Sequence, residues 1–117
     1  MTTNSATVFT QALDPTDFLD YVSEFDQILE SGETILAGFT VSPTTEGAAL
    51  GLEISTTFPP SLETGDRNVL YWLEVEVSKR TSSSFDYDGT QIPIEVTITT
   101  NTSRRYQRTF LVTVKHL

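Results

Sequence analysis

The feature that most restricts the fold of this chain is a run of apolar side chains at every second position of residues 68–79, "NVLYWLEVEVSK". The apolar residues of one parity are Val69, Tyr71, Leu73, Val75 and Val77. A period of two is typical of a β-strand that packs one face on a core. The other face is mixed, because Leu70 and Trp72 stand among glutamates. We therefore predict a strand whose second face is also partly apolar.

Two later segments repeat the alternation and predict an antiparallel hairpin. Their inward positions are Ile92, Ile94, Val96 and Ile98 in the first, and Tyr106, Phe110, Val112 and Val114 in the second. The polar residues Asn101 to Arg104 between them favour a tight turn. Pro93 has no N–H to donate, so we expect its strand to begin there or to lie near a sheet edge.

Weaker patterns in the first half predict further strands. The stretch "ETILAGFTV" carries Ile35, Phe39 and Val41, and "AALGLEIST" places Leu50, Leu52 and Ile54 on one face. Loops rich in Pro and Gly separate these segments at spacings typical of a β-sandwich.

The segment Asp14–Ile35 fits two interpretations. Its apolar residues have a helical rhythm, with Asp14 and Pro15 suited to a helix start and Gly32 to its end. Residues Leu19, Tyr21, Ser23 and Phe25 nevertheless alternate as in a strand. The local pattern alone favours a helix, so Asp17–Leu29 stays open between helix and strand at this point.

Composition narrows the class of protein. A chain of 117 residues with 38% hydrophobic content fits one globular domain. It has no cysteine, which excludes disulfides, thiolate zinc sites and cysteine nucleophiles. No apolar run approaches the ~20 residues of a membrane span, so we expect no membrane partner. Residues 1–11 lack the basic and apolar regions of a signal peptide.

The formal net charge of −9 is unevenly distributed. Thirteen acids and one base precede Lys79, whereas three acids and six bases lie from Lys79 onward. The acidic majority would repel phosphate, so we expect no nucleic-acid partner. Two interpretations remain: an acidic surface that keeps the protein soluble, or a dipolar module that docks on a neighbour of opposite charge.

Three short motifs resemble a family of small tailed-phage virion proteins, of the fibre–tail adaptor type. They are "ALDPTDFLDYVSEF", then "SGETI", then "IPIEVTITTNTSRRYQRTFLVTV", and the resemblance extends over most of the chain beyond Gln11. The resemblance implies an all-β fold, an immunoglobulin-like or fibronectin III-like antiparallel β-sandwich. It also implies that Leu19–Phe25 is a strand and that the following "DQILESG" is a short helical turn between sheets. We adopt this interpretation, with residues 1–12 as an extended N-terminal arm and residues 13–117 as the sandwich domain.

The sequence offers little catalytic chemistry. The only histidine, His116, lies next to the last residue, which is a poor position for a general base. The stretch Asp86–Gly89 ("DYDG") contains two acids but lacks the rest of a calcium loop, so an Asp-rich turn explains it better. Glu74 and Glu76 are explained by an exposed strand face. We therefore predict no enzyme, no catalytic residue, no cofactor and no metal site.

We instead expect surface contacts with other proteins. The candidates are aromatic residues in polar surroundings and a basic cluster near the last hairpin. They are Phe9, Trp72, Phe85, Tyr87, Arg104, Arg105 and Arg108. Trp72 also has a plainer interpretation, packing under the Pro59–Pro60 loop.

The resemblance implies a structural, non-enzymatic role as a tail, neck or fibre adaptor of a tailed-phage virion, made in the host cytoplasm. Its partners would be tail, neck or major capsid subunits, and it would be present in many copies. Two alternatives remain open. One is a capsid decoration (cement) protein that clamps major capsid subunits, and the other is a free carbohydrate- or protein-binding β-sandwich module.

Overall fold

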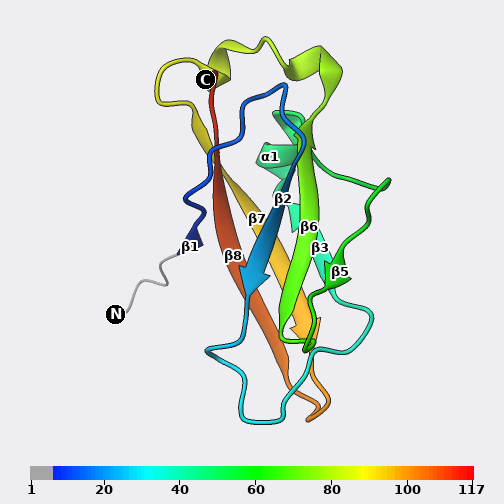
Figure 1. Cartoon of the computed structure of the whole chain (residues 1–117). Coiled ribbons are helices and arrows are strands. Elements are labelled where there is room, and N and C mark those ends of the chain that lie inside the picture. The colour runs from blue at the N-terminus through cyan, green and yellow to red at the C-terminus, as the bar shows by residue number, and fades with distance from the viewer. Residues whose placement is uncertain (1–6) are drawn as a thin grey trace.

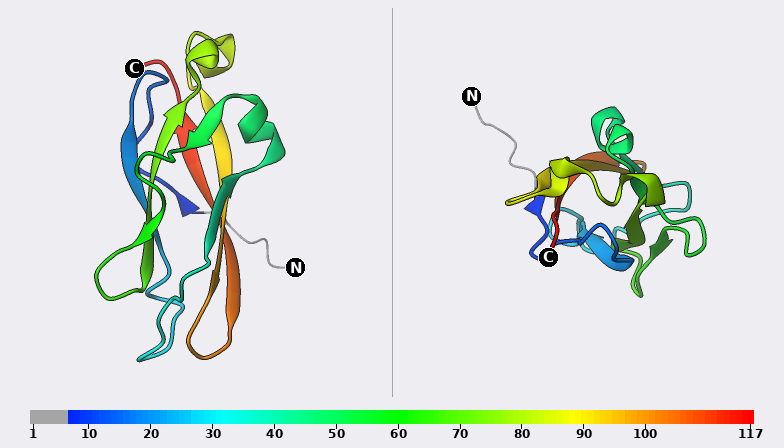
Figure 2. Two further views of the ribbon diagram at one scale, coloured as in Figure 1. Left: turned by 90° about the vertical axis from the view of Figure 1, so that its right-hand side faces the viewer. Right: turned by 90° about the horizontal axis from the view of Figure 1, so that it is seen from above.

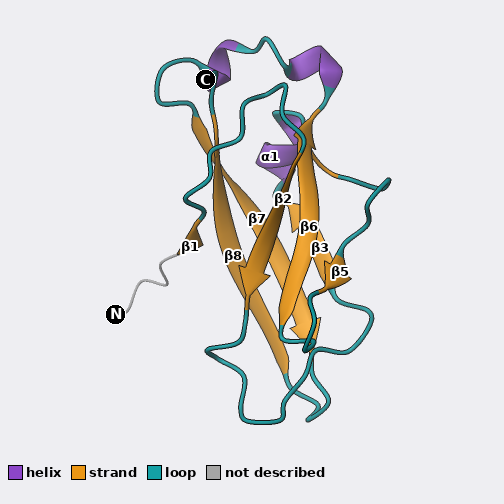
Figure 3. Ribbon diagram, viewed as in Figure 1, coloured by secondary structure: helices purple, strands orange, loops and turns teal. Residues whose placement is uncertain are grey.

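A computed structural model describes residues 7–117 of the chain, and these residues form two β-sheets with three short helices (Figures 1 and 3). The strands are β1 (Thr7–Val8), β2 (Leu19–Glu24), β3 (Thr40–Pro43), β4 (Leu52–Ile54), β5 (Ser61–Leu62), β6 (Asn68–Val75), β7 (Thr90–Thr99) and β8 (Arg105–Val114). The helices are α1 (Thr45–Ala49) and the 3-10 helices η1 (Val77–Lys79) and η2 (Ser83–Phe85).

The two sheets lie face to face (Figures 1 and 2). The first, here called the β8 sheet, has the order β1-β8-β7-β3, and the second, the β6 sheet, has the order β2-β6-β4 with β5 also paired to β6. All pairs are antiparallel except β1 with β8, which is parallel. The predicted all-β architecture of two layers is therefore confirmed.

The core lies between the sheets and is built by the predicted alternation. Each long strand sends every second side chain inward, as the burial pattern of β6 shows most clearly. The fully buried members of these strands are Val69, Tyr71, Leu73, Val75, Ile94, Val96, Ile98, Val112 and Val114. One buried polar pair interrupts this apolar layer, because the hydroxyls of Ser23 and Tyr71 are hydrogen-bonded at 2.6 Å.

The ambiguous segment near the start contains a strand, not a helix. Residues Leu19–Glu24 pair with β6 over their whole length, so tertiary pairing overrides the local helical pattern. The next residues form one hydrogen-bonded turn, in which the N–H of Leu29 donates to the carbonyl of Phe25 (3.2 Å). The chain then crosses from the β6 sheet to the β8 sheet, as expected.

The helix α1 was not predicted, and it corrects the strand expected through Leu50. Thr44 caps its start by accepting a hydrogen bond from the Gly47 N–H (3.3 Å). Leu50 is the C-cap, and β4 begins only at Leu52, after Gly51 with φ of 101°. A side chain at Gly47 would collide with Ile92, so glycine allows the helix to close against the sheet edge.

The described part of the predicted arm belongs to the sandwich. Thr7 and Val8 pair with Phe110 and Leu111 of β8, and Leu13 is completely buried. Chain segments tied into a sheet in this way add to its hydrogen-bonded ladder. Residues 1–6, the other half of the predicted arm, lie outside the described residues.

The predicted hairpin is confirmed, but one expectation about a strand end is wrong. Of the two alternatives for Pro93, the position near a sheet edge holds: β7 begins earlier, at Thr90, and Pro93 lies beyond the last residue of β7 that pairs with β3. Val77, expected inward, is 73% exposed because β6 ends at Val75 and the chain turns into η1. None of the helices in residues 7–117 has the length and apolar character that a membrane span requires.

Candidate functional site

Three aromatic side chains contact one another on the outer surface of the β6 sheet. The ring centroids of Phe18 and Trp72 are 5.0 Å apart, those of Phe58 and Trp72 are 5.2 Å apart, and those of Phe18 and Phe58 are 5.8 Å apart. Phe18 is 37% exposed and Phe58 is 49% exposed. Large rings bury much apolar surface when a partner covers them, so this cluster is the leading candidate for a contact site.

Trp72 faces outward because of its position in β6. Its neighbours Tyr71 and Leu73 point into the core, so the alternation places Trp72 on the opposite face. Leu70, two residues before Trp72, lies on the same face of β6 and opposite Val22 of β2. We call Phe18, Val22, Phe58, Leu70 and Trp72 the aromatic face.

Phe18 is placed by a tight turn that precedes β2. The carboxylate of Asp14 accepts hydrogen bonds from the backbone N–H and the hydroxyl of Thr16 (2.9 and 2.7 Å). It also accepts one from the backbone N–H of Leu117 (2.7 Å). These bonds, with that of Leu117 the largest contribution, lower the pKa of Asp14 to about 2. The turn therefore ties the lead-in to Phe18 to the end of the chain.

Phe58 is placed by a second turn, centred on the buried Ser55. The Ser55 hydroxyl accepts hydrogen bonds from the N–H groups of Thr57 and Phe58 (3.2 Å each). The N–H of Ser55 itself donates to the carbonyl of Trp72 (2.9 Å). Local side-chain bonding of this kind fixes a loop that has no strand partner. Trp72 therefore supplies one ring of the cluster, and its carbonyl anchors the loop that supplies the ring of Phe58.

Carboxylates surround the aromatic face. Asp20 lies directly opposite Trp72 in the β2–β6 pair. Glu53 lies opposite Glu74 in the β4–β6 pair, a like-charge arrangement that is unfavourable without a cation. Arg80 supplies one, since its guanidinium lies 3.7 Å from the Glu74 carboxylate. The site is therefore apolar at its centre and acidic at its margin.

The other predicted contact residues lie elsewhere. Tyr87 is 96% exposed, in the loop between η2 and β7, near the C terminus in Figure 1. The basic residues lie at the opposite end of the sandwich, on and beside the β7–β8 hairpin. There Arg104 pairs with Glu30 (3.2 Å), and Arg108 lies over the ring of Tyr106 at 5.6 Å. The structure does not bring these groups together with Trp72.

The expected exposure of Phe85 is wrong. Its side chain is completely buried, and its ring contacts that of His116 with centroids 6.2 Å apart. The polar sequence around Phe85 suggested an exposed loop, but the N–H of His116 bonds the Phe85 carbonyl and holds η2 against the domain. Phe9 packs within the domain, because its half-buried ring contacts the rings of Tyr21 (4.9 Å between centroids) and Phe110 (5.8 Å).

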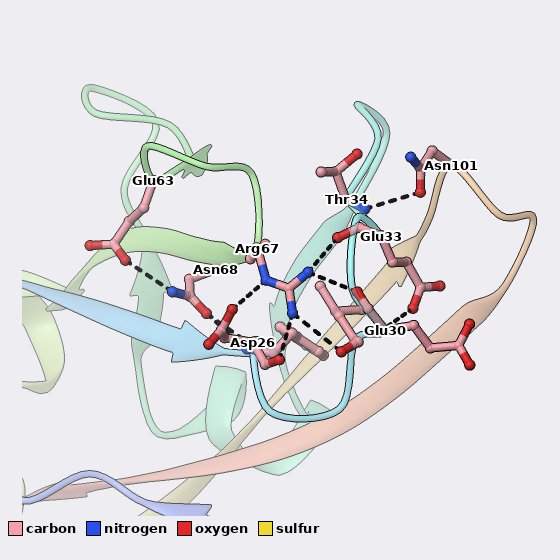
Figure 4. Close-up of polar contacts among 10 residues, drawn as sticks. Asp26, Glu30, Glu33, Thr34, Glu63, Arg67, Asn68 and Asn101 are labelled. Atoms are coloured by element: carbon pink, nitrogen blue, oxygen red, sulfur yellow. Dashed lines mark hydrogen bonds and ion pairs between the residues drawn. The ribbon is translucent and has the colours of Figure 1, made fainter.

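The densest polar cluster is structural. Figure 4 shows the guanidinium of Arg67 inside the loop that follows β2. It pairs with the Asp26 carboxylate and donates to backbone carbonyls at 2.8–3.2 Å. Those carbonyls belong to Asp26, Leu29, Glu30 and Glu33. No buried side-chain nitrogen or oxygen among residues 7–117 lacks a partner, so this cluster leaves none for a ligand.

Glu33 connects the same loop to the β7–β8 hairpin. Its carboxylate is completely buried and accepts hydrogen bonds from the hydroxyls of Thr100 and Thr102 (2.6 Å each). These two bonds, followed by one from the Glu30 N–H, lower the pKa of Glu33 to about 2. Beside it, the backbone N–H of Thr34 donates to the side-chain oxygen of Asn101 (3.0 Å; Figure 4). The contacts of Arg67 and Glu33 hold the loop after β2 against the β7–β8 hairpin.

His116 does not form a catalytic arrangement. Its Nε2 atom lies 3.1 Å from the Ser82 carbonyl and 3.5 Å from the Asp86 carboxylate, and the N–H of its own backbone is bonded to Phe85. These contacts fix the end of the chain on η2. In the described part of the chain, no three histidine, aspartate or glutamate side chains are grouped so that they would hold a metal ion.

Sequence reasoning found Trp72 but missed Phe18 and Phe58. The signal for Phe18 was present, since it has the parity opposite to Leu19, Tyr21 and Phe25 and must face outward if those face inward. Phe58 had no such signal, because it lies in a loop whose path depends on Ser55 and β6. As for known proteins, no family model matches this chain, and no curated protein matches it either.

Proposed function

We propose that this chain is a non-enzymatic attachment domain that docks on a partner protein through the aromatic face. The observation that carries the proposal is the contact among two exposed rings and the half-buried ring of Trp72, contributed by the lead-in to β2, the β4–β5 loop and β6. Aromatic residues gathered at one place dominate the binding energy of many protein interfaces. A domain that binds no partner gains no stability by leaving aromatic rings open to water.

We also propose that the sandwich is immunoglobulin-like. In that fold, strands B, E and D form one sheet and strands C, F and G the other. Here β2, β6 and β4 occupy the first set of places, and β3, β7 and β8 the second. The parallel pairing of β1 with β8 adds a first strand to the last one. This order of strands supports the assignment that the sequence resemblance implies.

The margin of the site indicates the chemistry of the partner. Asp20 and Glu53 flank the rings on a domain with a net charge of −9. A complementary surface would place apolar side chains over Trp72 and lysine or arginine around them. Charge complementarity of this kind governs partner choice and the rate of association more than affinity.

The sequence resemblance supports a tailed-phage virion as the assembly, with a tail, neck or fibre adaptor as the role. In a symmetric particle many copies act together, so weak individual contacts suffice. A capsid decoration protein would use the same surface on a major capsid subunit. Both roles predict that the aromatic face is covered in the particle.

The proposal is tested by cryo-EM of particles assembled in host cells, with the wild-type chain and the variants Trp72→Ala and Phe58→Ser. We expect the chain in purified particles with its aromatic face covered, and a loss of both variants from the particles. Thr97→Ala, on the outer surface of the other sheet, is the matched control and should assemble normally. Particles that contain the chain with its aromatic face open to solvent would contradict the proposal.

A carbohydrate-binding module is the second candidate, because exposed rings also provide stacking surfaces for sugars. The rings here lean on one another at interplanar angles of 24°, 35° and 49°, which leaves less of each face free. Glycan titration of the isolated chain distinguishes the candidates. Binding at millimolar concentration or tighter that is lost in Trp72→Ala or Tyr87→Ala would favour the module.

A further inference from the structure

The edge of β8 near the hairpin has no strand beside it among residues 7–117. β1 covers β8 only from Phe110 onward, and the chain then continues along β8 to Leu13. The first half of β8, residues 105–109, pairs with β7 on one side alone. An unpaired row of N–H and C=O groups is a template for another strand.

The direction of the free groups follows from the bonds that β8 makes farther along. The carbonyls of Leu111 and Thr113 accept hydrogen bonds from Phe9 and Leu13, so residues of this parity face away from β7. The N–H groups of Arg105, Gln107 and Thr109 therefore face the open edge. Their spacing of two residues is the spacing at which a paired strand bonds.

Other strands at sheet edges are short. β3 has four residues and ends in a proline, and β4 has three residues. Short edge strands resist addition of another chain. β2, at the edge of the β6 sheet, has six residues but carries the acidic side chains of Asp20 and Glu24. The open part of β8, residues 105–109, is an edge that carries arginine.

Positive charge gathers at this edge of an acidic domain. Arg104, Arg105 and Arg108 are all exposed, and the alternation places Arg105 and Arg108 on opposite faces of the sheet. The guanidinium of Arg108 also donates to the carbonyl of Gln107 (2.9 Å), one of the groups that a neighbouring strand would use. Two identical edges would repel each other, whereas a carboxylate-bearing strand would be attracted on both faces.

We propose that residues 105–109 of β8 bind an extended acidic segment of a partner protein by strand addition to the β8 sheet. Backbone hydrogen bonds to Arg105, Gln107 and Thr109 hold the segment in register. Carboxylates on the two faces of the segment pair with Arg105 on the outer face and with Arg108, released from Gln107, on the other. This surface is separate from the aromatic face and does not depend on it.

The test uses the full chain, labelled for NMR, and a synthetic peptide of threonine and glutamate that carries glutamates on both faces when it is extended. We expect slower hydrogen exchange at the amides of Arg105, Gln107 and Thr109 when the peptide is present. Gln107→Pro removes the central edge N–H without removing a bond to β7, and it should weaken binding about tenfold, the effect of losing one or two hydrogen bonds. The double variant Arg105→Gln, Arg108→Gln should weaken it by a similar factor and is the second measure should the proline variant not fold.

Two controls make the outcome decisive. Trp72→Ala should bind the peptide as the wild type does, which separates this surface from the aromatic face. A peptide with lysine in place of glutamate should not bind. The proposal is overturned if the lysine peptide binds equally well, or if the acidic peptide leaves the three amides unchanged at millimolar concentration. It is also overturned if those amides are already protected in the protein alone, because the edge would then be occupied without the peptide.

Discussion

The outer surfaces of the two sheets differ, although their inner surfaces are built alike. On the β8 sheet the outward positions of the long strands carry mainly threonine and glutamine. They include Gln91, Thr97, Thr99, Gln107, Thr109 and Thr113, while Pro93, Leu111 and the exposed Val8 of β1 are the apolar exceptions. On the β6 sheet, the corresponding outward positions include Val22, Leu70 and Trp72. Phe18 and Phe58 extend that apolar surface.

The two outer surfaces show which outward side chains the fold needs and which it does not need. Both sheets bury alternate apolar residues, and threonine on the water side suits a pleated backbone without exposing apolar area. The β8 sheet shows that such a surface is sufficient for this fold. The aromatic face is therefore not explained by folding, and a partner that covers it gives the better account.

The largest effect is expected from a ring that belongs to the core despite its polar surroundings. Phe85→Ala leaves a cavity at a completely buried site and should lower the free energy of unfolding by about 3–5 kcal/mol. Tyr87→Ala, two residues away and almost fully exposed, should change it by less than about 0.5 kcal/mol. Urea denaturation measures both. Equal effects of the two changes would show that the end of the domain near the C terminus is arranged differently.

A matched pair of leucines on β6 compares the inner surface with the outer one. Leu73→Ala removes a completely buried side chain and should cost about 2–5 kcal/mol. Leu70→Ala, on the aromatic face, should cost about 1 kcal/mol. The same denaturation experiment measures them. A larger loss at Leu70 than at Leu73 would reverse the assignment of inner and outer surfaces.

Acid should weaken the hairpin end through Glu33. Hydrogen bonding lowers the pKa of Glu33 from 4.5 to about 2, so its contribution to stability is complete above pH 4.5 and is lost as the pH falls toward 2. Glu33→Gln should be less stable than the wild type at pH 7, and the difference should shrink over that interval. Melting temperature measured against pH tests this. A difference that stays constant from pH 7 to 2 would contradict the assigned role of the carboxylate.

Trp72→Ala should affect binding much more than stability. The change removes two ring contacts at a half-buried site, which are worth about 1 kcal/mol of folding free energy. Loss of a ring at an interface centre costs about 2 kcal/mol or more of binding free energy. Thermal melting and particle incorporation together measure the two effects. A fall in melting temperature as large as that of Leu73→Ala would place Trp72 in the core instead.

The smallest effect is expected on the outer surface of the β8 sheet. Thr97→Val replaces a hydroxyl that makes no hydrogen bond to another described residue and keeps the branched shape that strands favour. The free energy of unfolding should change by less than about 0.5 kcal/mol, and particle incorporation should not change. Loss of incorporation would show that this surface, too, contacts a partner.

Local sequence determined the strands whose side chains alternate over many residues. It predicted the inward sets of β6, β7 and β8 and the hairpin that joins the last two strands. It also limited Leu19–Phe25 to a helix or a strand. The reason is that period-two alternation is a local pattern, and it is unambiguous when repeated over eight or ten residues.

Only the tertiary structure decided which loops fold back on the domain. Phe85 is buried because the end of the chain bonds its backbone, and Phe58 meets Phe18 because Ser55 and Trp72 are joined. The guanidinium of Arg67 donates to backbone carbonyls of a loop that begins about forty residues earlier in the chain, at Asp26. Contacts between residues so far apart leave no mark in a local pattern, since they depend on how two sheets come together.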